Sequence, residues 1–378
     1  MKRMIALLLA LLILPTCAGA EMTLFSVNVG KADAHLLHHG DTLYLIDAGT
    51  AASYGQLSAA LKTLGVTHLD GVIVTHTDKD HVGGLMALAT SAIEIDAWYA
   101  SAYFTGVKEK KHPAVLAAKV RGQSVNWLQN GDSLPLGEGV LKVLAPIEAS
   151  DEENDNSLVL LADTPDGRML FMGDAELMAE SRLMTAHKLP RCEVLKVGHH
   201  GADDATSDLL LATVQPSLAV ISTSTEERAE TPGMGTLRSL LKAGAEIAVT
   251  QDAPGGVLVT LNRGKASALM AAWPEMPMPV TGLRFSEKNN KEETLRLHND
   301  SDEAIDLTGC FIRSAEGNEA FSLPAGTMIG AGESLLITTE TSDVTGDILW
   351  PEEKVWDNQS SDAAYLCDVY GRVLAIME

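Results

Sequence analysis

The stretch Thr75-His76-Thr77-Asp78-Lys79-Asp80-His81-Val82-Gly83-Gly84 decides the fold of this chain. It places two imidazoles and two carboxylates within six residues, directly after the apolar run Gly71-Val72-Ile73-Val74. A short β-branched run that ends in polar residues is typical of a buried strand that delivers those residues to a sheet edge. Histidine nitrogen and aspartate oxygen are ligands of zinc and manganese. The stretch therefore predicts a metal site; the alternative is a polar turn, which would need neither these ligand types nor the glycine pair.

Three later segments place similar residues at predicted strand ends. Gly173-Asp174 follows the apolar run 168–172, and Gly198-His199-His200-Gly201 follows a second such run. Asn154-Asp155-Asn156-Ser157 stands just before a third. Capping of the next helix is the alternative role for Asp174. The paired histidines favour ligation more strongly, because glycine permits close backbone approach and buried imidazoles otherwise need partners.

Six segments in this order resemble the metallo-β-lactamase fold, and most of all its ComEC-type competence branch. They are residues 27–34, 45–49, 75–84, 156–160, 172–174 and 195–201. The resemblance covers residues 22–261 and implies an αββα sandwich with a dinuclear metal centre between its two sheets. The alternation of predicted strands and helices agrees with a layered α/β domain.

The resemblance also assigns the ligands of two divalent ions, zinc or manganese. His76 and Asp78 would bind one ion, Asp80 and His81 the other, and Asp174 both. One of His199 and His200 would complete the second site, while its neighbour contacts the substrate or its leaving group. The residues to which we assign the catalytic role are Asp80 and His200.

Further residues of the same segments are expected around these ligands. Asp47 would orient a ligand histidine from the second coordination shell. Asp33 would face the same site, and Asn156 and Ser157 would border it on the substrate side.

The chain departs from the wider family at two ligand positions. A histidine is more usual where Asp78 stands, and often a further one where Asn156-Ser157 stands; the ComEC-type branch shares both departures. More oxygen and fewer imidazoles make manganese as plausible as zinc. ComEC-like chains also tend to carry a His-Pro pair where this chain has Thr231-Pro232. Either the phosphate contact made by that histidine is lost, or another residue supplies it.

Residues 1–20 have the features of a cleaved signal peptide. Two basic residues precede the apolar stretch 5–14, which is too short to span a bilayer, and Ala18-Gly19-Ala20 is a small-residue cleavage site. We therefore expect a mature chain that begins at Glu21 and is secreted or extracytoplasmic. No later segment is long and apolar enough to cross a membrane.

The remaining chain divides into two predicted domains. Residues 21–268 form the metallo-β-lactamase-like domain, and the Pro-rich stretch 269–281 is a linker. Residues 282–378 have short strands separated by Gly, Asn and Pro turns, which indicates a compact all-β, Ig-like sandwich. This part is similar to a lamin-tail domain. The segments that carry the similarity are 297–300, 304–310 and 323–326.

The cysteines do not form a disulfide framework. Cys310 and Cys367 both lie in the C-terminal domain and could pair in an oxidising compartment. Cys192 is expected to pack as a small apolar side chain.

The chain is strongly acidic. It has 51 acidic and 28 basic residues, two of the latter in the leader, and a formal net charge of −23. Such a charge repels polyanions, whereas non-specific nucleic-acid binding draws on Lys and Arg. Nucleic acid is therefore disfavoured as a partner. For a phosphodiester substrate, the metal ions must supply most of the positive charge.

Metal-assisted hydrolysis is the chemistry that fits these residues. A water between two cations loses a proton near neutral pH and attacks phosphorus or a carbonyl carbon. No Gly-x-Ser-x-Gly nucleophile signature competes with it.

We predict an exported phosphodiesterase or nuclease-like enzyme, acting on small nucleotide or cell-wall phosphodiesters. The alternatives are a hydrolase of lactone or amide bonds, and a non-catalytic exported binding protein with a relic metal site, whose β-sandwich binds a surface or partner.

Overall fold

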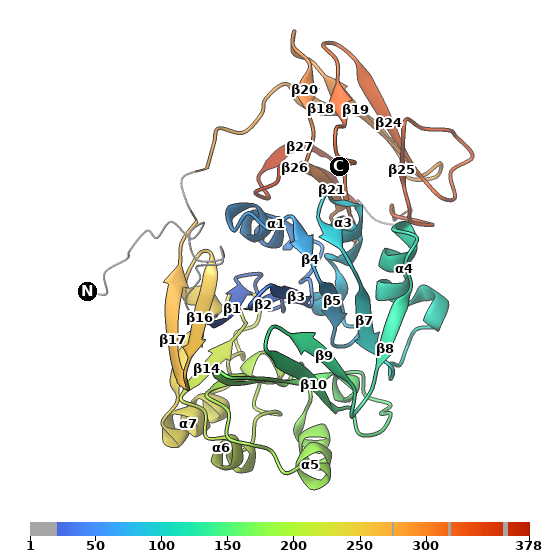
Figure 1. The fold of residues 1–378 in the computed structure, drawn as a ribbon. Coiled ribbons are helices and arrows are strands. Elements are labelled where there is room, and N and C mark those ends of the chain that lie inside the picture. The colour runs from blue at the N-terminus through green and yellow to red at the C-terminus, as the bar shows by residue number, and fades with distance from the viewer. Residues whose placement is uncertain (1–20, 274–275, 317–318, 358–361) are drawn as a thin grey trace.

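A computed structural model describes residues 21–273, 276–316, 319–357 and 362–378. Two stacked sheets with helices on their outer faces form the N-terminal domain, and a smaller all-β domain packs beside it (Figure 1). The predicted signal peptide, residues 1–20, lies outside the described residues. Within the described residues, no helix is long and apolar enough to cross a membrane.

The first sheet brings together strands from both ends of the N-terminal domain. Its order is β17 (Lys265–Ala271), β16 (Gly256–Asn262), β1 (Met22–Val27), β2 (His35–His39), β3 (Thr42–Ile46), β5 (Gly71–Val74), β7 (Trp98–Ser101) and β8 (Val125–Leu128). β2 is antiparallel to both β1 and β3, and β3 is parallel to β5. The carboxyl ends of β1, β3 and β5 therefore lie at the same edge of the sheet.

In the second sheet, the parallel strands end at the edge that faces the carboxyl ends of β1, β3 and β5. Its order is β15 (Glu246–Val249), β14 (Leu218–Ile221), β13 (Val194–Lys196), β12 (Gly167–Phe171), β11 (Val159–Thr164), β10 (Gly139–Ala145) and β9 (Ser133–Leu136). β12 to β15 are parallel, and β11 is antiparallel to β12. The start of β11 thus lies beside the carboxyl ends of β12 and β13.

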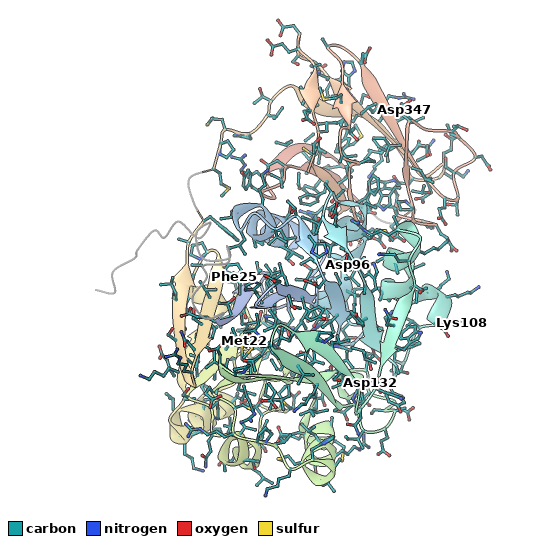
Figure 2. All side chains as sticks on the ribbon, viewed as in Figure 1. Met22, Phe25, Asp96, Lys108, Asp132 and Asp347 are labelled. Atoms are coloured by element: carbon teal, nitrogen blue, oxygen red, sulfur yellow. The ribbon has the colours of Figure 1, made fainter. Side chains whose placement is uncertain are left out.

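Alternating apolar side chains place the first sheet between two hydrophobic cores. On β1, Met22 and Leu24 pack against the second sheet, whereas Phe25 and Val27 pack against the outer helices. Figure 2 labels Met22 and Phe25, which extend to opposite sides of the strand. This period of two residues is the expected consequence of the pleat, and it explains why the strand is apolar on both faces.

Helices cover the outer face of each sheet. α1 (Tyr54–Thr63), α3 (Leu85–Thr90) and α4 (Pro113–Val120) share a core with the first sheet. α5 (Leu177–Ala186), α6 (Asp208–Val214) and α7 (Met234–Ala243) share one with the second sheet (Figure 1). The αββα prediction is confirmed.

Two local features define the ends of these elements. The segment after β5 forms two short helices, α2 (Lys79–Val82) and α3, and Gly84 is the N-cap of the second. A Cβ on Gly84 would lie 2.3 Å from the carbonyl oxygen of Ala48, so only glycine allows this loop to approach the end of β3. β17 runs to Ala271, so the first residues of the predicted linker belong to the sheet.

The C-terminal domain is all-β, as predicted. One sheet contains β18 (Leu283–Asn289), β19 (Thr294–Asn299), β24 (Ser334–Thr339) and β25 (Ile348–Trp350). The other contains β22 (Ala320–Ser322), β21 (Phe311–Ser314), β26 (Ala364–Cys367) and β27 (Val373–Met377), and a short pair joins β20 (Ile305–Asp306) to β23 (Met328–Ile329). Cys310 and Cys367 are buried free thiols, so the disulfide considered from the sequence is not formed in this structure.

One hydrophobic core crosses the boundary between the domains, and the C-terminal domain has a second core of its own. Phe311 of β21 belongs to the same cluster as α1 and α3, and its ring packs edge-on against Tyr54 at a centroid distance of 5.1 Å. Ser322 donates a 3.3 Å hydrogen bond to the Tyr54 hydroxyl, and its backbone N–H donates to Thr90 Oγ1 at 2.9 Å. The C-terminal domain therefore packs against α1 and α3, two of the helices that cover the first sheet.

We predict that Phe311→Ala destabilises the whole chain by about 3–5 kcal/mol, because it removes a buried ring common to both domains. Calorimetry should show one unfolding transition, displaced to lower temperature. Ile376→Ala, on the exposed face of β27, is the control and should change the stability by less than about 0.5 kcal/mol. Two separate transitions, with only one displaced, would contradict the shared core.

A second prediction concerns Glu352, near the contact between the domains. Burial, followed by the charges of Glu319, Glu340 and Glu353, raises the pKa of Glu352 to about 7 from an ordinary 4.5. The folded protein therefore retains a proton that the unfolded chain releases, so stability decreases as the pH rises from about 4.5 to 7.

We expect Glu352→Gln to match the wild type in stability near pH 5 and to exceed it by about 1–2 kcal/mol at pH 8. Denaturant unfolding across this pH range is the measurement. Glu138→Gln, at an exposed position in the turn between β9 and β10, should show no such gain. Equal pH profiles for Glu352→Gln and the wild type would refute the assignment.

Candidate metal centre

Six segments meet where the corresponding edges of the two sheets face each other. Three follow the carboxyl ends of β1, β3 and β5; two follow β12 and β13; and one precedes β11. The sequence-predicted residues that converge here are Asp33, Asp47, His76, Asp80, His81, Asp174 and His200. They come together because parallel strands deliver their next residues to a common edge.

Asp174 lies at the centre of this convergence. Its Oδ2 is 3.2 Å from His81 Nε2 and 3.1 Å from His200 Nε2. His200 Nε2 is also 3.3 Å from Asp80 Oδ2. His76, His81 and Asp174 form one group of potential ligand atoms within 4.8 Å of one another, and Asp80, His81 and His200 form a second. The two groups overlap at His81.

The unpaired nitrogens indicate what the site is built to hold. Nε2 of His76, His81 and His200 and Oδ1 of Asp174 are buried without a hydrogen-bond partner. The nitrogens of His81 and His200 lie close to Asp174, yet their geometry is not that of a hydrogen bond. Buried imidazole nitrogens without partners are costly. Divalent cations would satisfy them, so the residues present fit zinc or manganese.

The opposite nitrogen of each imidazole is held by a neighbour. His81 Nδ1 lies 2.8 Å from Asp47 Oδ2, and His200 Nδ1 lies 2.9 Å from the carbonyl oxygen of Ser222. His76 Nδ1 lies 3.2 Å from Ser157 Oγ. Contacts at Nδ1 fix the ring orientation and direct each Nε2 into the site. Asp47 thus contacts His81, and its orienting role toward a metal ligand stays a prediction.

The histidine pair has an unusual backbone. His199 and His200 have φ values of 43° and 52°, in the left-handed region that non-glycine residues seldom adopt. Such residues cost about 1–3 kcal/mol each and persist where surrounding contacts determine them. Here the backbone directs the two rings to different places.

His200 enters the site, whereas His199 faces a second set of carboxylates. His199 Nδ1 lies 2.9 Å from Asp204 Oδ1 and 3.9 Å from Glu176 Oε1, and its side chain is 20% exposed. The sequence prediction left open which histidine is the ligand, and the geometry favours His200. Glu176 and Asp204 were missed, because nothing in their spacing distinguishes them from ordinary surface acids.

Asp78 lies at the rim of the site. Its Oδ2 is 3.9 Å from His76 Nε2, and its side chain is 49% exposed. Burial, together with the charge of Asp80, raises its pKa above the ordinary value. Asp78 is not part of any compact ligand group among the described residues, so its predicted ligand role would need the carboxylate to turn inward.

Asp33 forms a buried charge pair behind the ligands. Its Oδ2 accepts a hydrogen bond from Lys196 Nζ, and its Oδ1 is 3.5 Å from His200 Nδ1. Although burial opposes ionisation, Lys196, His35 and His200 hold the pKa of Asp33 well below its usual range. Lys196 was not predicted from the sequence, although it stands in the quoted segment 195–201.

The carboxylates at the centre are ionised. Burial opposes ionisation, but the charges of His200 and His81 hold the pKa of Asp174 well below its ordinary value. For Asp80, burial is likewise outweighed by the close contact with His200 and by the charges of His81 and Lys31, so its pKa is also lowered. Fixed negative charge at the centre suits a site for cations.

Ser157 and Asn156 have different positions. Ser157 Oγ contacts His76 and accepts a 3.1 Å hydrogen bond from the Asp174 backbone. Asn156 exchanges hydrogen bonds of 2.9 Å with the backbone of Ser150 and so closes its own loop. Ser157 therefore borders the ligands directly, while Asn156 shapes the segment that carries it.

Comparison with known families adds to this geometry. Residues 27–225 match the model of the Metallo-beta-lactamase superfamily, and residues 280–378 match that of the Lamin Tail Domain. ComE operon protein 3 of Bacillus subtilis is 28% identical over 250 residues, which are 61% of this chain and 32% of that protein. Competence protein ComA of Neisseria gonorrhoeae is 28% identical over 247 residues, which are 64% of this chain and 32% of that protein. These matches confirm the predicted resemblances, and the chain spans about a third of these relatives' length.

The comparison also found similar solved structures. The metallo-beta-lactamase fold protein YhfI from Bacillus subtilis is 12% identical, with a TM-score of 0.41 over 64% of this chain and 99% of that one. A diphosphatase from the PhnP family is 13% identical, with a TM-score of 0.42 over 64% of this chain and 98% of that one.

We predict that Asp47→Asn weakens metal binding about 10- to 100-fold, because the amide no longer holds His81 by a charged contact. Competition with a chromogenic chelator measures the change. Asp166→Asn is the matched control, since Asp166 pairs with His39 at 3.3 Å outside the site. A metal affinity unchanged in Asp47→Asn would show that Asp47 does not support a ligand.

Proposed function

Because this chain belongs to the metallo-β-lactamase superfamily through residues 27–225, we propose that it is an exported metal-dependent phosphodiesterase. The observation that carries the proposal is the set of buried, unpaired ligand atoms around Asp174. Three imidazoles and two ionised carboxylates are a donor set suited to two divalent ions.

Each residue would have a separate task in this reaction. His76 and Asp78 would hold one ion, Asp80, His81 and His200 the other, and Asp174 both. Two ions held there would supply Lewis acidity and lower the pKa of a water molecule toward neutrality. The protein would contribute the orientation of the ligand rings through Asp47, Ser157 and the Ser222 carbonyl oxygen.

His199 is positioned to contact the substrate or its leaving group. Asp204 lies beside its Nδ1, which favours a proton on that nitrogen and leaves Nε2 available. The partial exposure of the His199 ring is compatible with contact to a bound molecule. With a second proton on Nε2, the imidazolium can donate that proton to the leaving oxygen when the P–O bond breaks.

The charge of the chain supports small or wall-attached phosphodiesters over polynucleotides. A net charge of −23 repels a long polyanion, whereas a single phosphodiester carries one charge. Export, by the leader at residues 1–20, would place the enzyme beside such substrates, and the lamin-tail-like domain could hold it on a surface or partner. One of the two relatives, ComA, is named a competence protein, and a nucleic-acid substrate is kept as an outcome to be tested.

One observation favours the hydrolysis of another bond, such as a lactone or amide. Thr231 stands where ComEC-like chains have a histidine, and it is buried with its Oγ1 2.8 Å from Thr223 Oγ1. It therefore offers no evident contact to a phosphate. A lactone or amide substrate would not need that contact.

The proposal predicts about two manganese or zinc ions in each purified mature chain. Asp80→Ala and His81→Ala should each abolish hydrolysis of bis-p-nitrophenyl phosphate and leave the far-UV circular dichroism native-like. Asp166→Ala, outside the site, serves as the control and should retain activity.

Full activity in both site variants would exclude the metal-hydrolase assignment. Bound metal with hydrolysis of lactones or amides alone would favour the second candidate. Metal without any turnover, or no bound metal, would favour a non-catalytic binding protein.

A further inference from the structure

Lys31 brings a positive charge to the outer side of the candidate metal centre. It stands in the turn after β1, and its Nζ lies 2.7 Å from Asp80 Oδ2. The same carboxylate oxygen lies 3.3 Å from His200 Nε2. The ammonium therefore contacts an atom of the ligand set itself, and its side chain is 18% exposed.

The backbone beneath Lys31 is held in place. Its N–H donates a 3.1 Å hydrogen bond to Glu227 Oε2, from the loop that also contains Thr231. Gly30, with φ of 81°, lies so close to this carboxylate that a Cβ would be 2.1 Å from Glu227 Oε1. The backbone of this turn is therefore held against Glu227. The long side chain of Lys31 can still move from Asp80 to another partner.

The buried lysine of the site cannot take the same role. Lys196 is 1% exposed and its ammonium is bonded to Asp33 behind the ligands. Removing it from that pair would take the nearest positive charge away from a buried carboxylate, which is strongly destabilising. Lys31 differs because its partner, Asp80, belongs to a ligand set for cations.

The geometry points to Lys31 as a specificity-determining residue that binds an anionic oxygen of the substrate phosphate. This inference rests on the proposed phosphodiesterase function. Lys31 is attracted to Asp80 only while that carboxylate carries uncompensated charge. In the metal-loaded protein its three N–H donors are free to turn to a phosphate oxygen. Lys31 would then supply the contact that Thr231 cannot make, and it would favour an anionic substrate over a neutral lactone or amide.

The test compares anion binding by metal-loaded wild type, Lys31→Gln and Lys31→Arg. Isothermal titration calorimetry with inorganic phosphate gives the dissociation constant without any turnover. Lys31→Gln should weaken phosphate binding roughly 10- to 100-fold, as expected for loss of a charged hydrogen bond, and Lys31→Arg should restore most of it. KM for bis-p-nitrophenyl phosphate should rise by a similar factor, whereas kcat/KM for a neutral lactone, where measurable, should not change.

Two controls separate this contact from general charge effects. Lys242→Gln removes an exposed lysine that pairs with Asp208 at 2.6 Å on the second sheet's outer helices, and it should bind phosphate like the wild type. Lys79→Gln removes a positive charge from the metal-binding stretch itself, and its effect should stay within about fivefold, as for an exposed screened charge.

Metal content must be equal in all variants. Loss of metal from Lys31→Gln would show that Lys31 acts by holding Asp80, and would overturn the inference. So would unchanged phosphate affinity and KM in a Lys31→Gln enzyme that still hydrolyses the phosphodiester. If the wild type neither binds phosphate nor hydrolyses a phosphodiester, the proposed phosphodiesterase function is wrong. The inference about Lys31, which rests on that function, is then wrong as well.

Discussion

The buried carboxylate of Asp47 is the constraint on which the site depends. It accepts hydrogen bonds from the backbone and hydroxyl of Thr75, at 2.8 and 2.7 Å, and lies 2.8 Å from His81 Nδ1. One fully buried side chain thus joins the end of β3, the end of β5 and the start of α2. A charge buried to this degree is tolerated only with full hydrogen bonding. The orientation of His81 follows from that requirement.

Negative charge dominates both the candidate metal centre and the chain as a whole, and this favours bound cations. The central carboxylates are ionised, the surface is acidic, and the buried lysine is committed to Asp33. Anionic substrates would be repelled by such a protein unless divalent ions reversed the local sign. Lys31 adds a single positive charge at the rim, where it can act on a substrate without filling the metal positions.

The second domain is part of the same structural unit. Phe311 completes the core over α1 and α3, and Ser322 bonds to both Tyr54 and Thr90. α3 directly follows α2, which carries Asp80 and His81. The C-terminal domain therefore packs against the helix that directly follows the stretch with Asp80 and His81.

The amino-acid sequence by itself determined the fold class and predicted most of the residues that converge on the candidate metal centre. The ligand motifs stand at the ends of apolar β-branched runs, and strand order brings such ends together. Sequence could not choose between His199 and His200, because that choice rests on two left-handed backbone conformations and on the Ser222 carbonyl. Lys196, Lys31 and the Tyr54–Phe311 contact were also decided only by tertiary structure, since each joins segments far apart in the chain and no local pattern marks its partner.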